Sequence, residues 1–315
     1  MATNTLEKKD TVHAGTAPAK TILFGEHAVV YGEPGIAIPL WNVQTTATLH
    51  PFAEDAEDQD FRVISDSVNL NEKYSRLPDA MPLKKLIRNI MEAFHIARPP
   101  RRILRIESTI PIASGLGSGA ACSVAIIRAF AAAYGFEAED SKISDIAFEI
   151  EKCYHGAPSG LDNTTISFGK PVFFRKGKGF EVIHVPEKLR LIVADTGLKS
   201  ITSEVVTDIR ERYQQFEPVI REIGRLVDRA RVTLENGDIF ETGALMDENH
   251  RLLQKMTVSC EKLDELVQIA RSNGAVGAKL TGAGRGGNFV ALADNALDAQ
   301  RVKAALEKSG AKIVR

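Results

Sequence analysis

The sequence predicts an α+β fold in two domains, and three observations lead to this prediction. Apolar and polar residues alternate in segments of the first half, such as 37–52, which is typical of strands in an antiparallel or mixed sheet. A long charged region over residues 202–273 has helical character. The composition shifts near residue 186, and a length of 315 residues suits two domains or one large one. We therefore expect an N-terminal domain over 1–185 and a C-terminal domain over 186–315.

The first domain should begin with a polar tail over residues 1–13. The acidic segment 53–60 fits a solvated hairpin tip, and 81–97 fits a helix because Pro82 stands near its start, where proline is favoured. The remaining elements that we expect are a strand over 101–110, an Ala-rich helix ending near Gly135, a helix over 143–156 that Gly156 ends, and a hairpin over 169–185.

The second domain should begin with an apolar strand just after residue 186. The helical region that follows should be broken at residues that disfavour helix interiors, namely Pro218, Gly224, Gly237 and Gly243. The chain should then close with two strands, the second over 286–293, followed by a helix over 296–309 and a last strand from residue 311.

Composition and charge exclude several classes of function. The chain has 40 Lys and Arg residues against 41 Asp and Glu, so neither sign dominates as a nucleic-acid or membrane-surface role would require. Cys122, Cys153 and Cys260 lack the spacing of disulfides or zinc sites, which indicates a reducing compartment and small buried side chains. No signal peptide is visible and the seven histidines lack metal-ligand spacing, so we expect a cytoplasmic protein without structural zinc.

The segment SGLGSGAAC, residues 114–122, follows a predicted strand and opens a predicted helix. Glycines let the backbone approach a phosphate closely, and N–H groups at a helix start favour an anion. A tight strand-to-helix turn explains the same segment equally well. The Walker A ending is absent, and the match of Gly115, Gly117 and Ala120 to the Rossmann pattern is weakened by a preceding strand that is half polar.

A second glycine-rich run, KLTGAGRGGNFVALA over 279–293, leads from strand to strand and alone predicts only a hairpin loop. Two carboxylates are more informative. Glu151 lies at a predicted helix end and could simply be a solvated helix residue. Asp162 follows a Pro-Ser-Gly turn and could simply be a turn residue. Phosphoryl transfer, however, needs one carboxylate that orients or deprotonates the attacking hydroxyl and another that holds Mg²⁺. Lys20, in an apolar segment, could keep such a carboxylate ionised.

Four motifs occur in a fixed order along the chain: APAKTILFGEHAVVYG from residue 17, PIASGLGSGAAC from 111, HGAPSGLDN from 155 and KLTGAGRGGNFVAL from 279. On these motifs the chain resembles the GHMP family of small-molecule kinases, and within it the mevalonate kinases, over nearly its whole length. The resemblance implies a mixed-sheet N-terminal domain (ribosomal protein S5 domain 2-like) and a ferredoxin-like C-terminal domain. The N-terminal domain would carry the phosphate loop, residues 114–120.

The resemblance also implies roles for individual residues. Asp162 would be the catalytic carboxylate facing the acceptor hydroxyl, Lys20 its cationic partner, and Glu151 with Ser118 the ligands of Mg²⁺. The ATP phosphates would be bound by Pro111, Ser114, Gly115, Leu116, Gly117, Ser118, Gly119 and Ala120. The acceptor would be bound by Glu26, His27, Ser159, Thr202, Gly282, Ala283 and Gly284, with the segment 281–287 closing over both substrates. Glu26 and His27 would also suit a purely structural role.

Two positions depart from the family pattern. Many mevalonate kinases carry a serine that helps to hold Mg²⁺ where this chain has Gly119, and many relatives have glycine where this chain has Arg285. Arg285 could touch a phosphate or simply face solvent.

The activity that the resemblance implies is ATP-dependent phosphorylation of the C5 hydroxyl of mevalonate, giving 5-phosphomevalonate and ADP for isoprenoid biosynthesis. Two alternatives stay open: a kinase of the same family acting on phosphomevalonate or a sugar, and a non-catalytic nucleotide-binding sensor. The implied partners are the small molecules ATP and mevalonate, with Mg²⁺ as cofactor and no nucleic acid or membrane. Homodimers are common among relatives.

Overall fold

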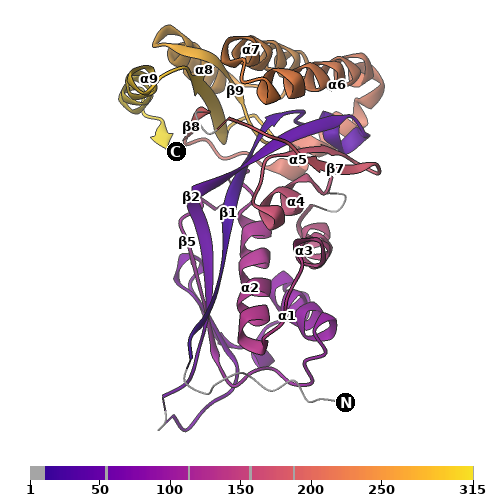
Figure 1. Ribbon diagram of the computed structural model, residues 1–315, viewed down its shortest axis with the longest axis vertical. Helices are drawn as coiled ribbons and strands as arrows, with labels where there is room; N and C mark the ends of the chain where they lie inside the picture. Colours follow the sequence, from indigo (N-terminus) through magenta and orange to yellow (C-terminus); the bar gives the residue numbers. More distant parts are fainter. Residues whose placement is uncertain (1–10, 54–55, 113, 156–157, 187–188, 315) are drawn as a thin grey trace. The chain divides into compact units, whose positions relative to one another are not determined.

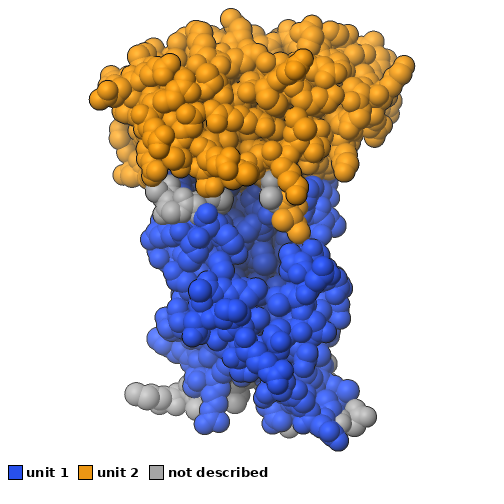
Figure 2. All heavy atoms as spheres, turned by 180° about the vertical axis from the view of Figure 1, so that it is seen from behind, with its two compact units in different colours: residues 1–19, 41–111, 117–169 blue, residues 20–40, 112–116, 170–315 orange. Residues whose placement is uncertain are grey.

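The computed structural model describes residues 11–53, 56–112, 114–155, 158–186 and 189–314. Most of the predicted polar tail and the predicted helix end at Gly156 lie outside this part of the chain. The chain folds into two compact units, which are described one at a time below (Figure 2). Unit 1 comprises residues 1–19, 41–111 and 117–169, and unit 2 comprises 20–40, 112–116 and 170–315. The expected domain boundary near residue 186 stays a prediction.

Strands and helices alternate irregularly along the chain, as an α+β fold requires (Figure 1). The strands are β1 (His13–Phe24), β2 (Pro34–His50), β3 (Arg62–Ser65), β4 (Leu70–Lys73), β5 (Ile103–Ser108), β6 (Val172–Arg175), β7 (Gly179–Val182), β8 (Arg190–Asp195), β9 (Ala275–Leu280), β10 (Asn288–Ala293) and β11 (Lys312–Ile313). The helices are α1 (Pro82–Ala93), α2 (Ser118–Tyr134), α3 (Asp140–His155), α4 (Leu161–Phe168), α5 (Thr202–Glu211), α6 (Tyr213–Glu235), α7 (Ile239–Lys255), α8 (Glu261–Ser272) and α9 (Ala296–Lys308). Short 3-10 helices cover Ala28–Tyr31, Asp66–Val68 and Tyr74–Arg76.

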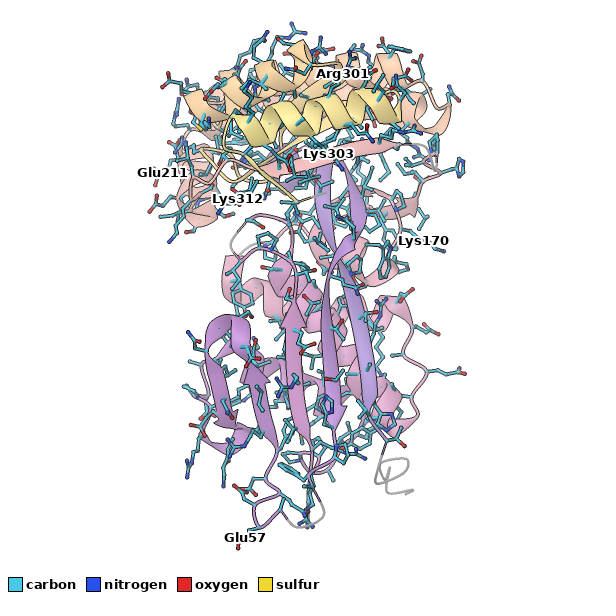
Figure 3. The ribbon with its side chains drawn as sticks, turned by 90° about the vertical axis from the view of Figure 1, so that its left-hand side faces the viewer. Glu57, Lys170, Glu211, Arg301, Lys303 and Lys312 are labelled. Carbon is cyan, nitrogen blue, oxygen red and sulfur yellow. The ribbon has the colours of Figure 1, made fainter. Side chains whose placement is uncertain are left out.

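The sheet of unit 1 has the strand order β4, β3, β5, β2, with β1 also paired to β2 (Figure 3). Strand β3 is parallel to β5 and antiparallel to β4, so the sheet is mixed, as expected. The acidic segment that contains Glu57 joins β2 to β3. Because β5 lies between these two strands, the prediction of a hairpin tip at 53–60 is wrong.

Helix α2 is the centre of unit 1. Its many alanines leave little side-chain bulk, so α1, α3, α4 and β5 all contact it. Its buried residues lie on all sides of the helix rather than on one stripe, which is typical of a core helix. Helix α2 ends at Tyr134 before a left-handed Gly135, as expected. The packing of α3 and α4 on α2 positions the site residues that these two helices carry, Glu151 and Asp162.

Unit 2 contains an antiparallel sheet with the order β11, β8, β10, β9. Strand β10 lies between β8 and β9, so the helices that join β8 to β9 make a split βαβ unit, which is typical of ferredoxin-like folds. Helices α7 and α8 contact β9, and α9 contacts β8 (Figure 1). The predicted hairpin over 169–185 is also present as β6 and β7, which pair antiparallel.

The predicted breaks of the helical region are only partly confirmed. Gly237 follows the end of α6, but α6 runs through Pro218 and Gly224, and α7 runs through Gly243. The break occurs instead at Arg212, between α5 and α6. Gly243 serves packing, because a Cβ there would lie 2.3 Å from the carbonyl oxygen of Val276 in β9. A close helix–sheet contact thus outweighs the low helix propensity of glycine.

The cysteines also differ from expectation. Cys153 is exposed, and Cys122 and Cys260 are partly exposed, so they are not buried side chains of the core.

Within the described residues, each helix is too short or too polar to cross a bilayer.

Candidate active site

Unit 1 brings together the start of α2 and the end of α3. Gly117 has a left-handed backbone with a φ of 76° and precedes Ser118, the first residue of α2. Helix α3 carries Glu151, whose side chain is buried. A Cβ built on Gly119 would lie 3.3 Å from the Oε1 atom of Glu151. The carboxylate of Glu151 therefore faces the first turn of α2, where N–H groups lack acceptors within the helix.

Asp162 lies in the first turn of α4 and is partly exposed. The left-handed Gly160, with a φ of 99°, precedes this helix, and the Oγ atom of Ser159 accepts a hydrogen bond of 3.2 Å from the N–H of Leu161. Asp162 is thus a residue of the helix and not its cap, and the helix start favours its negative charge.

The sequence did not indicate a role for Tyr154 of α3. Its ring lies against the first turn of α2, where its Cε2 atom would be 3.6 Å from a Cβ on Gly119. Tyr154 is 51% exposed, and partial burial of its phenol raises the pKa to about 12, with the charges of Cys122 and Glu151 acting in the same direction. Glu151 and Tyr154 together therefore border the space that a side chain at position 119 would occupy.

Unit 2 holds Lys20 against the phosphate loop. Lys20 is only 2% exposed, and its ammonium donates a hydrogen bond of 3.1 Å to the carbonyl oxygen of Gly115. Its backbone N–H donates to the carbonyl oxygen of Leu116 at 3.0 Å. A lysine charge is costly to bury, so its fixed place beside a glycine-rich loop indicates a site for an anion.

Glu26 has a partner that the sequence analysis missed. Both Glu26 and Lys279 of β9 are fully buried in unit 2, and the Lys279 ammonium forms an ion pair with Glu26. Lys279 also donates to the carbonyl oxygen of Leu280 at 2.7 Å. Burial raises the pKa of Glu26 and lowers that of Lys279, and the charge of each partner opposes these shifts. The only sequence signal was a lysine within an otherwise apolar strand.

His27 is neutral at ordinary pH. It is buried, with a left-handed backbone, and its Nε2–H donates a hydrogen bond of 2.9 Å to the carbonyl oxygen of Ala283. Burial lowers the pKa of His27 to about 4, and the charges of Arg285 and Lys279 act in the same direction. The Nδ1 atom is then the acceptor nitrogen of the ring.

The loop between β9 and β10 lies beside the first part of the phosphate loop in unit 2. Asn288 donates from its side-chain amide to the carbonyl oxygen of Ser114. A Cβ on Gly115 would be 3.8 Å from the Cα of Gly282. Thr281 donates from its hydroxyl to the carbonyl oxygen of Ile22 at 2.8 Å, so β1 is part of the same arrangement.

The predicted residues therefore fall into two groups. Within unit 2 the structure places the residues of β1 and its following turn, the phosphate loop from Ser114 to Leu116, the loop from Thr281 to Gly287, and Thr202 at the start of α5. Within unit 1 it places Gly117, Ser118, Gly119, Ala120, Glu151, Ser159 and Asp162, together with Pro111 after β5.

Comparisons with known proteins agree with this arrangement of motifs. Residues 82–170 match the family model of the GHMP kinases N terminal domain, and residues 230–312 match that of the GHMP kinases C terminal domain. The mevalonate kinase of Pyrococcus furiosus is 36% identical over 301 residues, which cover 89% of this chain and 89% of the relative.

Solved structures give the same result. A crystal structure of L. major mevalonate kinase in complex with R-mevalonate has a TM-score of 0.81 and 29% identity, covering 96% of this chain and 94% of that chain. The crystal structure of the Methanococcus jannaschii mevalonate kinase has a TM-score of 0.82 and 27% identity, covering 97% and 98%. The order of the motifs, the two family models and the similarity over nearly the whole length lead to one conclusion: this chain belongs to the GHMP kinase family.

Proposed function

We propose that this chain transfers the γ-phosphoryl group of ATP to the C5 hydroxyl of mevalonate, giving 5-phosphomevalonate and ADP. The structural observation that carries the kinase chemistry is the buried ammonium of Lys20, hydrogen-bonded at 3.1 Å to the phosphate loop at Gly115. Mevalonate as the acceptor is supported by relatives named mevalonate kinase and by the neighbour solved with R-mevalonate.

The catalytic roles follow from what each side chain can do. Asp162, in the first turn of α4, would accept the hydrogen bond of the attacking hydroxyl and orient it toward the phosphorus. Lys20 would stabilise the negative charge that builds up on the transferring group. The first N–H groups of α2, after the left-handed Gly117, would donate to phosphate oxygens.

Two residues of the first motif have different roles. The neutral His27 ring would accept a hydrogen bond from the acceptor at Nδ1, since its Nε2–H is used on Ala283. Glu26 is fully buried and paired with Lys279, so we assign it a positioning role and not a direct contact with the acceptor. It would fix the turn that carries His27 against β9.

The residues of unit 1 fit a magnesium ion bound mainly through the nucleotide. Mg²⁺ usually takes one or two carboxylates, phosphate oxygens and water. Within the described residues no cluster of three His, Cys, Asp or Glu side chains suits a metal, but the Glu151 carboxylate faces the first turn of α2. Glu151, with the Ser118 hydroxyl, would hold the ion, which would neutralise charge on the β- and γ-phosphates when bound.

The test is ADP release from Mg-ATP with mevalonate, phosphomevalonate, homoserine and galactose as parallel acceptors. We expect turnover with mevalonate and a loss of about 1,000-fold or more in Lys20→Met and Asp162→Asn. The exposed Lys170→Met and Asp145→Asn are matched controls that remove the same charges elsewhere and should keep activity. Turnover on another acceptor alone would overturn the substrate, and near-native rates in either site variant would overturn the residue assignment.

A further inference from the structure

Arg285 occupies a backbone position that suits glycine. The φ angles of Gly284, Arg285, Gly286 and Gly287 are 82°, 55°, 134° and 69°, so four successive residues have positive values. A residue with a Cβ is disfavoured in this region of conformational space, whereas glycine is not. An arginine among these four residues therefore needs contacts that offset the backbone strain of its positive φ angle.

The contacts of Arg285 supply such an explanation. Its guanidinium forms an ion pair with Asp208 of α5, and its Nε–H donates to the carbonyl oxygen of Thr257 at 3.1 Å. Its backbone N–H donates to the carbonyl oxygen of Val258 at 2.7 Å. The side chain thus joins three segments of unit 2: the loop after β9, helix α5, and the connection between α7 and α8.

Asp208 is the centre of a small network. The Nη1 atom of Arg212 lies 3.4 Å from the Asp208 carboxylate and donates to the hydroxyl of Thr257 at 3.0 Å. Hydrogen bonding from Arg285 holds the pKa of Asp208 below its usual value, so the carboxylate is ionised at neutral pH. Two guanidinium groups therefore share one carboxylate and one threonine.

The loop is also connected to the residues just before α5. Ser200 donates from its hydroxyl to the carbonyl oxygen of Gly284 at 2.5 Å, and the N–H of Gly287 donates to the carbonyl oxygen of Leu198 at 2.9 Å. Helix α5 begins two residues after Ser200, at Thr202. The loop is therefore attached both before the start of α5 and, through Arg285, at Asp208 within the helix.

We propose that Arg285 is a positioning residue that fixes the loop 281–287 to helix α5, so that Ala283, Gly284 and Thr202 are held in place before the acceptor binds. The inference rests on the proposed function only for the identity of the acceptor. The Nε and Nη2 atoms of Arg285 are engaged by Thr257 and Asp208, which supports a positioning role for this side chain. Holding a loop in its binding conformation lowers the entropy lost on binding, so it improves affinity more than the rate of chemistry.

The ion pair should be sensitive to salt. The side chains of Arg285 and Asp208 are 37% and 29% exposed, so dissolved ions reach both and screen their attraction. Raising the ionic strength should then loosen the loop in the native protein. The same increase should have a smaller effect on the loop in variants that lack the ion pair between Arg285 and Asp208.

The experiment compares Arg285→Gln, Asp208→Asn and the double variant with the native chain. Arg229→Gln is the control, because it removes an exposed arginine that pairs with Glu241 and Glu248, far along the chain from the loop. Amide hydrogen exchange of residues 281–287 in the protein without ligands should become roughly tenfold faster in each of the three variants and stay unchanged in the control. The KM for mevalonate should rise roughly three- to tenfold with kcat within twofold.

The double variant is the sharpest part of the test. If the two residues act through one ion pair, it should be no worse than either single variant, and its KM should depend less on salt. Additive effects, unchanged exchange in the loop, or a fall in kcat at constant KM would overturn the proposal. Because hydrogen exchange needs no turnover, the proposal can fail or hold independently of whether mevalonate is the acceptor.

Discussion

The glycine-rich segment at residues 114–120 and the one at 281–287 differ in where their backbone N–H groups go. In the first, residues 118–120 open α2, where N–H groups have no acceptor within the helix. In the second, Arg285 and Gly287 donate their N–H groups to the carbonyl oxygens of Val258 and Leu198. The first segment therefore suits an anionic ligand, and the second is a connector whose shape is fixed by its surroundings.

The second segment contributes carbonyl oxygens instead. Ala283 accepts from His27, and Gly284 accepts from Ser200. Strand β9 leads into this segment and contains Lys279, which forms an ion pair with Glu26. A run of glycines is thus suited to phosphate binding in one place and to close backbone packing in the other, and the acceptors of the N–H groups distinguish the two.

The largest effect should come from removing Lys279. Lys279→Met leaves Glu26 buried without its counter-charge, which should lower the free energy of unfolding by about 3–5 kcal/mol. Urea denaturation measures this loss. The control is Lys262→Met, which removes a partly exposed lysine paired with Glu265 and should change stability by less than about 1 kcal/mol.

A double variant separates the lost partner from the lost packing. Glu26→Leu combined with Lys279→Met replaces both charges with apolar groups and should recover most of the stability. A double variant that is less stable than Lys279→Met would show that the pair itself, and not the unpaired charge, supplies the stability.

The next effect tests how tightly the second segment is enclosed. Gly282 and Gly284 have almost the same φ, 83° and 82°, but a Cβ on Gly284 would lie 2.0 Å from the carbonyl oxygen of Val258, whereas contacts at Gly282 begin at 3.7 Å. Gly282→Ala should cost about 1 kcal/mol of unfolding free energy for backbone strain, and Gly284→Ala about 3 kcal/mol or more because the backbone must shift. Equal losses by urea denaturation would mean that Val258 does not enclose the loop.

A smaller effect concerns pH. His27 has a pKa of about 4 in the folded chain and about 6.5 when unfolded, so below pH 6.5 the unfolded chain binds a proton that the folded chain does not. Stability should therefore fall as pH decreases from 6.5 toward 4, by about 2 kcal/mol between pH 7 and 5 from this residue. His27→Gln, which keeps a side-chain N–H donor for Ala283, should lose less over the same range. Parallel curves for the two proteins in urea titrations would contradict the buried neutral imidazole.

The sequence predicted the parts of the fold that depend on local patterns. Pro82 at the start of α1, Gly135 after α2 and the hairpin of β6 and β7 are confirmed, because caps, turns and alternating strands are encoded within a few residues. It was wrong at Gly243, where a contact with β9 from a distant part of the chain overrides local helix propensity.

The candidate site shows the same limit. The motifs singled out Lys20, which the structure holds beside the phosphate loop, but not Lys279, which pairs with Glu26 across 253 positions of the chain. Arg285 was expected at a phosphate or in solvent, and the structure instead pairs it with Asp208. Partners that are far apart in sequence are set by the sheet order, which no short motif contains.

The smallest effect should come from the first segment, at Gly119. A Cβ there would lie 3.3 Å from Glu151 and 3.6 Å from Tyr154, so a side chain needs only a slight shift of its neighbours. Gly119→Ser and Gly119→Ala should each change the free energy of unfolding by less than about 1 kcal/mol, unlike Gly284→Ala.

The two variants at Gly119 should differ in nucleotide binding. Serine places a hydroxyl beside Glu151, where it can add an oxygen ligand to the proposed magnesium site, and alanine adds only bulk. The affinity for an ATP analogue with Mg²⁺, measured by calorimetry without turnover, should therefore rise roughly three- to tenfold in Gly119→Ser and not in Gly119→Ala. Equal affinities would mean that Glu151 is not a metal ligand, or that Tyr154 already fills the space that the hydroxyl would need.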